Sequence, residues 1–133
     1  MASLQTLHVL VVDSDRLTCE ATTETVEALG HRATGETESA RALKVFFANP
    51  YDFDLAIIEP VMPETTGLDV AIALRRIRPG FPVLFYGGYF DDTFRRKTAT
   101  IRVGAIACKP LVSWELGKEI DVALALAPKT VIH

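Results

Sequence analysis

The chain has few of the residues from which small disulfide or zinc proteins are built. Its 133 residues include two cysteines, Cys19 and Cys108, and three histidines. Neither set has the spacing of a disulfide framework or of a zinc site, so no structural metal is expected. We expect both cysteines to act as small apolar side chains in a reducing compartment.

Long apolar runs and a basic surplus are also missing. No stretch approaches the ~20 apolar residues that span a bilayer, and the N-terminus lacks a cationic segment leading into an apolar one. We therefore expect a cytoplasmic protein without membrane contact. The net charge is −3, whereas direct nucleic-acid binding calls for a basic excess, so no such contact is expected.

What the chain does contain is typical of one globular domain. Hydrophobic residues make up 49% and charged residues 23%, which excludes intrinsic disorder and supplies a sizeable core. The length fits a single domain. We predict that this domain covers residues 7–126 and that residues 127–133 form a tail or the start of a linker.

Short apolar runs are the strongest structural signal. They are HVLVV at residues 8–12, LAII at 55–58, PVLFY at 82–86 and AIAC at 105–108. Such continuous hydrophobicity indicates strands covered on both faces, as in parallel sheets flanked by helices. A fifth, weaker strand is expected at residues 31–35.

Helical periodicity fills the segments between these runs. Two apolar stripes are expected to face the sheet: Val70, Ala73, Leu74 and Ile77, then Leu116, Ile120, Ala123 and Leu124. A third stripe of Ala40, Leu43 and Phe47 predicts a helix capped by Thr37 and ended at Asn49.

Two further helices complete the pattern. The first should cover residues 15–29 and end at Gly30, and the fourth should cover residues 92–101. The fourth is expected to be the loosest, because threonine is a poor helix former. Strands that alternate with helices predict an α/β, flavodoxin-like doubly wound sheet of five parallel strands with five helices, in the order 2-1-3-4-5.

In that topology, polar residues that follow the strands share one crevice. Asp13 and Ser14 follow the first strand and Glu59 the third, while Gly87 and Lys109 follow the fourth and fifth. Asp13, Glu59 and Lys109 should form a cluster of two carboxylates and one ammonium group, in which the lysine offsets carboxylate repulsion.

At these residues the chain resembles the receiver domains of two-component response regulators. The resemblance covers about residues 7–126 and rests on four motifs: an acidic loop after VLVV, a carboxylate followed by PVMP and Gly67-Leu68, then Pro82-Val83, and then Lys109-Pro110. The Gly88-Tyr89 turn and residues 101–116 look most like receivers attached to hybrid sensor histidine kinases.

The resemblance implies a phosphoacceptor site. In the family, an aspartate after the third strand accepts phosphate from a histidine kinase, and the lysine holds the phosphoryl group. Magnesium lies between that aspartate, the acidic loop and a backbone carbonyl, whose positions here are Glu59, Asp13 and Val61 respectively. The resemblance also implies that the Lys109-Pro110 bond is cis, which is the minor form of X-Pro bonds.

Several positions depart from the family pattern. Glu59 replaces the aspartate and extends the carboxylate by about 1.5 Å, which disfavours in-line phosphoryl transfer. Ser14 replaces an acid, and a hydroxyl is a poorer magnesium ligand than a carboxylate. Gly87 replaces the hydroxyl residue that contacts the phosphoryl group, and Ile106 replaces the aromatic residue that reports switching. We expect weak magnesium binding or none, and no other cofactor.

These residues predict a non-enzymatic receiver that works as a phosphorylation-independent interaction module in bacterial signalling. Glu59 reaches toward Lys109 and imitates part of a phosphoryl charge, which suggests a domain locked in one state. The implied partners are signalling proteins: a histidine kinase, a phosphotransfer protein or an output protein. The sequence leaves open whether the domain forms a homodimer. Lys109 has two equally weighted roles, in phosphoryl contact or in charge neutralisation alone.

Two alternatives stay open from the sequence. The first is a receiver phosphorylated at a different acid, Asp13 or Asp15. The second is a haloacid-dehalogenase-like phosphatase with Asp13 as nucleophile and Asp15 as acid, for which Asp91-Asp92 would supply the extra acidic pair. A nucleotide-binding flavodoxin-like protein is disfavoured, because the turn after the first strand lacks glycine.

Charge is divided unevenly along the chain. Residues 1–66 hold 4 basic and 11 acidic residues, whereas residues 67–133 hold 10 and 6. Two basic clusters lie in adjacent predicted helices: Arg75, Arg76 and Arg78, and Arg95, Arg96 and Lys97. They are expected to be either solvated helix faces or one basic edge, with Arg95, Arg96 and Lys97 as a docking surface for an acidic partner.

Overall fold

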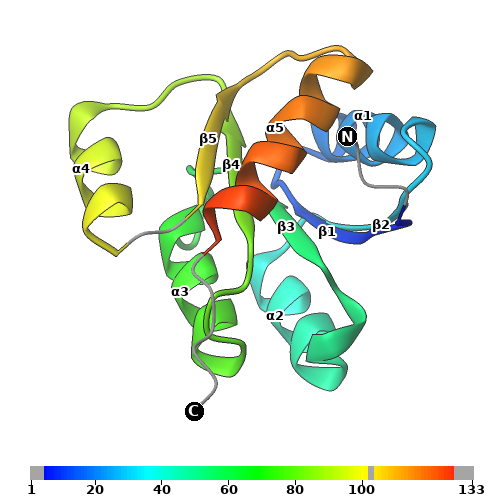
Figure 1. The fold of residues 1–133 in the computed structure, drawn as a ribbon. Helices are drawn as coiled ribbons and strands as arrows, with labels where there is room; N and C mark the ends of the chain where they lie inside the picture. Colours follow the sequence, from blue (N-terminus) through cyan, green and yellow to red (C-terminus); the bar gives the residue numbers. More distant parts are fainter. Residues whose placement is uncertain (1–4, 102–103, 128–133) are drawn as a thin grey trace.

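The computed structural model describes residues 5–101 and 104–127 and shows one central sheet between helices (Figure 1). The strands are β1 (His8–Val12), β2 (Arg32–Glu36), β3 (Leu55–Ile58), β4 (Val83–Gly87) and β5 (Ala105–Cys108). All of their pairings are parallel, in the order β2-β1-β3-β4-β5. The predicted fold class and strand order are confirmed.

Five α-helices and one short 3-10 turn connect the strands. The helices are α1 (Arg16–Ala28), α2 (Ser39–Ala48), α3 (Gly67–Ile77), α4 (Asp92–Ile101) and α5 (Ser113–Leu126), and the turn covers Pro50–Asp52. α1 and α5 lie on one face of the sheet, while α2 and α3 lie on the other (Figure 1). Residues 128–133, most of the predicted tail, lie outside the described part of the chain.

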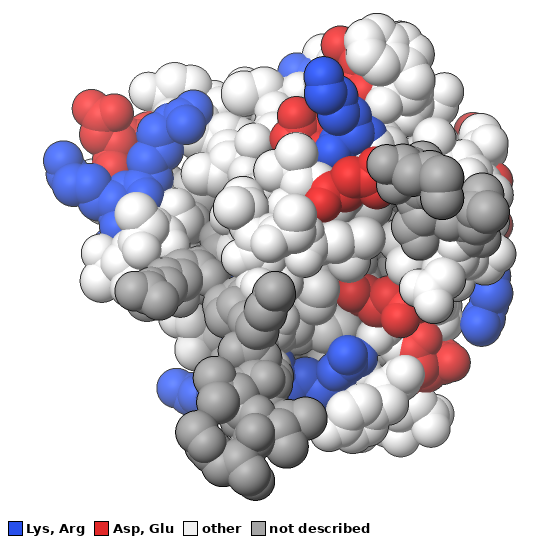
Figure 2. All heavy atoms as spheres, viewed as in Figure 1, with Lys and Arg blue, Asp and Glu red and all other residues white. Residues whose placement is uncertain are grey.

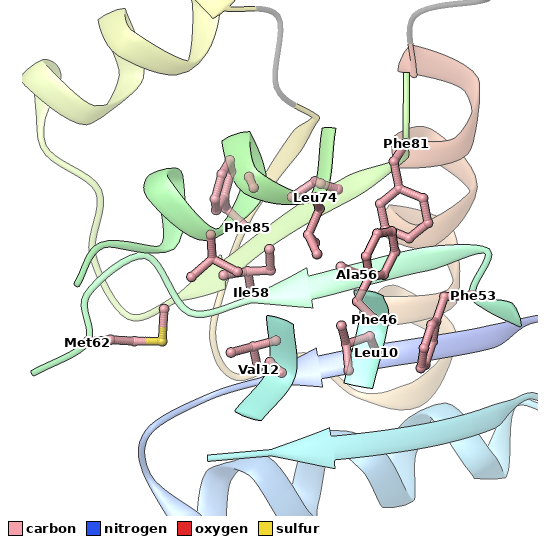
Figure 3. Close-up of a cluster of buried hydrophobic side chains, with 14 of the residues drawn as sticks. Leu10, Val12, Phe46, Phe53, Ala56, Ile58, Met62, Leu74, Phe81 and Phe85 are labelled. Atoms are coloured by element: carbon pink, nitrogen blue, oxygen red, sulfur yellow. The ribbon is translucent and has the colours of Figure 1, made fainter. Parts of the chain in front are cut away.

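Alternating side chains of each strand feed two separate cores. In β1, Leu10 and Val12 point toward α2 and α3, whereas Val9 and Val11 point toward α1 and α5. Every residue of β1, β3 and β4 is therefore buried, which explains the unbroken apolar runs. Figure 3 shows the first core, where the rings of Phe46 and Phe81 meet edge to face 5.0 Å apart.

The buried face of α2 differs from the one predicted from the sequence. The helix begins at Ser39 and its N-cap residue is Glu38, not Thr37. Ala42 and Phe46 are fully buried, while the side chain of Phe47 is 47% exposed. Two adjacent phenylalanines both fit a helical period, and only the packing against the sheet selects between them.

The predicted stripes of the other helices are closer to the structure. Leu116, Ile120 and Ala123 of α5 are buried as predicted. In α3, Val70 and Leu74 are buried, but Ala71 replaces Ala73 on the buried face. Ile77, the last residue of α3, is 45% exposed. Trp114 is also exposed.

Candidate functional site

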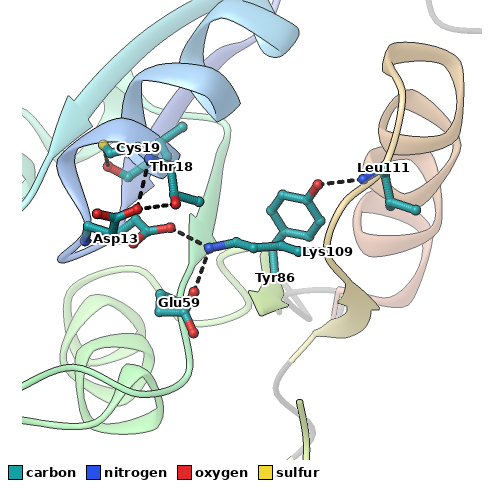
Figure 4. Close-up of polar contacts among 9 residues, drawn as sticks. Asp13, Thr18, Cys19, Glu59, Tyr86, Lys109 and Leu111 are labelled. Atoms are coloured by element: carbon teal, nitrogen blue, oxygen red, sulfur yellow. Dashed lines mark hydrogen bonds and ion pairs between the residues drawn. The ribbon is translucent and has the colours of Figure 1, made fainter. Parts of the chain in front are cut away.

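The carboxyl ends of the strands bring the predicted polar residues together (Figure 4). Asp13 directly follows β1, Glu59 follows β3 and Lys109 follows β5. The backbone continues the sheet at these positions, since Glu59 N–H donates to Val12 O at 2.9 Å and Lys109 N–H donates to Gly87 O at 2.8 Å. The three side chains therefore start from neighbouring points of one rim.

Lys109 lies between the two carboxylates. Its Nζ is 2.5 Å from Asp13 Oδ2 and 2.5 Å from Glu59 Oε2. Asp13 is buried, and the side chains of Glu59 and Lys109 are each 17% exposed. The structure thus forms the acid, acid, ammonium cluster that the topology predicts, with one negative charge left over.

Burial and charge act in opposite directions on Lys109. Desolvation lowers the pKa of its ammonium group, but hydrogen bonds and charges from Asp13 and Glu59 outweigh this effect and raise the pKa above its ordinary value. The ammonium also lies 5.5 Å from the centre of the Tyr86 ring. Lys109 therefore stays protonated at neutral pH.

Asp13 and Asp15 have different structural roles. Asp13 Oδ1 accepts the backbone N–H of Asp15 at 2.9 Å, so both of its oxygens are engaged at the site. Asp15 is the N-cap of α1 and accepts hydrogen bonds from the backbone N–H and the hydroxyl of Thr18. These bonds lower the pKa of Asp15. Asp15 turns toward the helix, which disfavours its predicted alternative role as a second catalytic acid.

Asp91 is a second acid that acts as a cap. Its Oδ1 accepts the backbone N–H of Phe94 at 2.7 Å, at the start of α4. The Asp91-Asp92 pair therefore opens a helix, which leaves the phosphatase alternative without a structural argument for its extra acidic pair.

The residues at the site fit magnesium poorly. Ca²⁺ and Mg²⁺ require several oxygen ligands. Here one oxygen of each carboxylate is already bonded to Lys109 and is not free to bind a metal ion. Ser14, which takes the place of a second loop acid, is exposed, and so is Val61. Within residues 5–101 and 104–127, no group of three or more Asp, Glu, His and Cys side chains is placed to hold a metal ion.

The remaining predicted positions lie around this cluster. Gly87 ends β4, and Ile106 is half-buried in β5, opposite Phe85 of β4. The peptide bond between Lys109 and Pro110 is cis. The roles of Gly87 as the phosphoryl-contact position and of Ile106 as the switch position stay predictions.

Two of the three basic residues at the end of α3 are engaged by backbone carbonyl groups. Arg75 Nε donates to Phe81 O, and Arg78 donates to the carbonyl oxygens of Pro50 and Phe53. Arg75 thus binds the backbone between α3 and β4, and Arg78 binds the backbone in and just after the 3-10 turn that precedes β3. Arg95, Arg96 and Lys97 are exposed on α4, and Figure 2 shows basic atoms gathered over that helix.

Two contacts at the site were not expected from the sequence. The hydroxyl of Tyr86 accepts the backbone N–H of Leu111 at 2.9 Å and so ties β4 to the loop after Lys109. Pro60 is buried against Gly87, where an added Cβ would lie 2.7 Å from Pro60 Cδ. The alternation of β4 places Tyr86 on the α5 side, but no sequence signal indicates the contact between Pro60 and Gly87.

Comparison with known proteins agrees with this geometry. A model of the response regulator receiver domain matches residues 9–121, which is most of the chain. The chain belongs to the receiver domain family. Receiver domains are signalling modules of two-component systems and are generally not enzymes. They interact with histidine kinases and output domains.

Two curated relatives contain a similar segment. The chain is 29% identical over 123 residues to the response regulator protein TodT of Pseudomonas putida, covering 91% of this chain and 52% of TodT. It is 28% identical over 117 residues to Ethylene receptor 2 of rice, covering 86% of this chain and 15% of the receptor. The chain thus spans only part of either relative.

Solved receiver structures share the fold. A receiver domain protein from Clostridium thermocellum has a TM-score of 0.82 at 21% identity, over 90% of this chain and 94% of that chain. TrrA from Thermotoga maritima, solved in complex with Mg²⁺ and BeF, has a TM-score of 0.76 at 24% identity, over 89% and 99%. In the described part of this receiver, no helix is long and apolar enough to cross a membrane.

Proposed function

We propose that this receiver is a phosphorylation-independent protein-interaction module. The observation that carries the proposal is the bond between Glu59 and Lys109 at 2.5 Å. In the family pattern the lysine is the residue that holds the phosphoryl group. Here an internal carboxylate, attached to the backbone after β3, engages that lysine.

The chemistry around Glu59 supports the same conclusion. Transfer of a phosphoryl group needs an oxygen aligned within about an ångström and a charge-neutralising metal. Glu59 is longer than the usual aspartate, Ser14 supplies no charge, and Gly87 supplies no hydroxyl. The Asp13–Lys109–Glu59 cluster therefore serves as a permanent substitute for the charge balance that phosphorylation creates elsewhere in the family.

A receiver fixed in one state would act by binding other signalling proteins. We propose that a histidine kinase, a phosphotransfer protein or an output protein docks on α4, where Arg95, Arg96 and Lys97 are exposed. A homodimer is the alternative arrangement. The cytoplasmic location expected from the sequence stays a prediction.

The proposal is tested with a small-molecule phosphodonor. The protein is incubated with acetyl phosphate and Mg²⁺, and intact mass spectrometry measures whether one phosphoryl group is added. We expect no added mass at Glu59, Asp13 or Asp15, because none of these carboxylates is both free of structural bonds and aligned for attack. A phosphorylatable receiver in the same reaction is the positive control.

The opposite result has a clear meaning. A stable phosphoryl adduct on Glu59 would overturn the proposal, and an adduct on Asp13 or Asp15 would support the receiver that uses a nonstandard acid. Titration with beryllofluoride and Mg²⁺ gives an independent readout. The backbone amide NMR shifts of Lys109 and Gly88 are expected to stay unchanged.

A further inference from the structure

Two glycines lie close to Glu59 and Pro60. At Gly67, an added Cβ would be 2.3 Å from Glu59 O and 2.9 Å from Pro60 Cα. At Gly87, an added Cβ would be 2.7 Å from Pro60 Cδ and 2.8 Å from Pro60 Cγ. All of these distances are below ordinary van der Waals contact, so neither glycine has room for a side chain.

The contact with Gly87 is steric and does not depend on an unusual backbone conformation. Gly87 is the last residue of β4 and is not among the described glycines with positive φ. In a strand, alanine is normally favoured over glycine by about 0.5–1 kcal/mol, because glycine loses more entropy on folding. At position 87, the close contact with Pro60 therefore outweighs the usual preference for alanine over glycine.

The same contact reaches the charged cluster. A Cβ at Gly87 would lie 3.0 Å from Glu59 Oε1, while the other oxygen of that carboxylate is bonded to Lys109. The ring of Pro60 is fixed to the backbone and does not rotate away. A side chain at position 87 would therefore displace the Glu59–Pro60 segment, and with it the carboxylate that is bonded to Lys109.

We infer that Gly87 is a positioning residue: the bare end of β4 accommodates the Pro60 ring, and Pro60 in turn holds the Glu59 carboxylate on Lys109. The loss of the hydroxyl at position 87 and the presence of glutamate at position 59 are then parts of one matched arrangement. This inference rests on the proposed function in its claim that the Glu59–Lys109 bond defines the fixed state, but its test requires no phosphodonor.

A double-mutant cycle tests the inference. The proteins are the wild type, Gly87→Ala, Pro60→Ala and the double variant, and the midpoint of thermal unfolding is measured for each. Gly87→Ala is expected to lower the midpoint by roughly 5–10 °C, as overpacking does. In the Pro60→Ala background, Gly87→Ala should lower the midpoint by less than about half as much, because the ring atoms Cγ and Cδ are gone.

The matched control is Gly88→Ala. An added Cβ at Gly88 meets nothing within 4 Å, so this variant should differ from the wild type by less than about 2 °C. A second readout separates positioning from general packing. We expect the Lys109 ammonium protons to exchange slowly while they are bonded to Asp13 and Glu59. Their NMR signal should therefore weaken in Gly87→Ala and return in the double variant.

Two results would overturn the inference. One is an unchanged or raised midpoint for Gly87→Ala, which is the ordinary outcome for a glycine in a strand. The other is an equal cost of Gly87→Ala in both backgrounds with an intact Lys109 signal. Either result leaves the phosphodonor experiment unaffected, so failure of this inference is distinguishable from failure of the proposed function.

Discussion

Lys109 joins three elements of the molecule through one side chain. Its ammonium bonds to the residues that follow β1 and β3, while its own backbone follows β5. Asp13 and Glu59 would repel each other without this charge, because their carboxylates are largely withdrawn from water. We therefore expect Lys109 to stabilise the fold as well as the state of the site.

Replacement of Lys109 by methionine should destabilise the protein by about 1–3 kcal/mol at pH 7, since two largely buried carboxylates lose their partner. The folded pKa of Lys109 is raised above its unfolded value of about 10.4, so the contribution is complete below that pH and is lost as the pH rises through the folded pKa. Urea unfolding from pH 7 to 11.5 measures it.

The control for this prediction is Lys118→Met, which removes an exposed lysine of α5. It should change the free energy of unfolding by less than about 0.5 kcal/mol at every pH. An equal loss in both variants, or a loss for Lys109→Met that persists unchanged at pH 11.5, would contradict the role given to Lys109.

The sequence predicted the residues of the cluster but not their finer contacts. Asp13, Glu59 and Lys109 follow three strands whose carboxyl ends share one edge, so their meeting depends only on topology. The fit of Pro60 against Gly87 depends on differences of a few tenths of an ångström in the spacing between different elements. No periodicity or spacing in the sequence carries that information.

At the scale of the elements, strands were easier to predict than helix faces. β1, β3 and β5 have the predicted bounds, because their apolar runs are nearly continuous. Both faces are covered in β1 and β3, whereas Cys108 at the end of β5 is exposed. In α2 the adjacent side chains of Phe46 and Phe47 compete for one buried position, and the core accepts only the first. The predicted bounds of the helices were closer to the structure than the predicted buried faces.

The buried face of α2 is tested by two matched substitutions. Phe46→Ala should lower the free energy of unfolding by about 3–5 kcal/mol, because Phe46 is fully buried against Phe53 and Phe81. Phe47→Ala should cost less than about 1 kcal/mol, because this side chain is half exposed. Chemical denaturation measures both. Equal costs, or a greater cost for Phe47→Ala, would contradict the packing described.

α4 is attached to the rest of the molecule by few side chains. Phe94 is half-buried and contacts Phe85 and Phe90, and Thr98 is buried, while Arg95 and the other basic residues face solvent. In Figure 1 this helix stands apart from the others beside the sheet. The expectation that α4 is the loosest helix stays a prediction, and this sparse packing supports it.

At the scale of the whole molecule, charge is separated between the two halves of the chain. Residues 1–66 contribute −7, from 4 basic and 11 acidic residues, and residues 67–133 contribute +4, from 10 and 6. Acidic side chains line the hollow between α1 and β2, including Glu20, Glu27 and Glu36, whereas exposed basic residues gather on α4 (Figure 2). An acidic partner would therefore be steered toward α4.

Charge reversal at Arg95 and Arg96 tests this steering. The double variant to glutamate should slow association with the cognate kinase or output protein about tenfold at low salt and flatten the salt dependence of the rate. Stopped-flow or biolayer measurements provide the rates. Reversal of Lys44 and Lys118, exposed on α2 and α5, changes the net charge equally and should have a smaller effect. Equal slowing in both variants would assign steering to net charge instead of α4.

The close contacts of Glu59 and Pro60 with Gly67 and Gly87 also limit which single substitutions the site can accept. A side chain at position 87 would meet the proline ring, and aspartate at position 59 would hold its carboxylate further from Lys109. Either substitution alone would disturb the cluster, so we expect positions 59, 60 and 87 to vary together in related sequences.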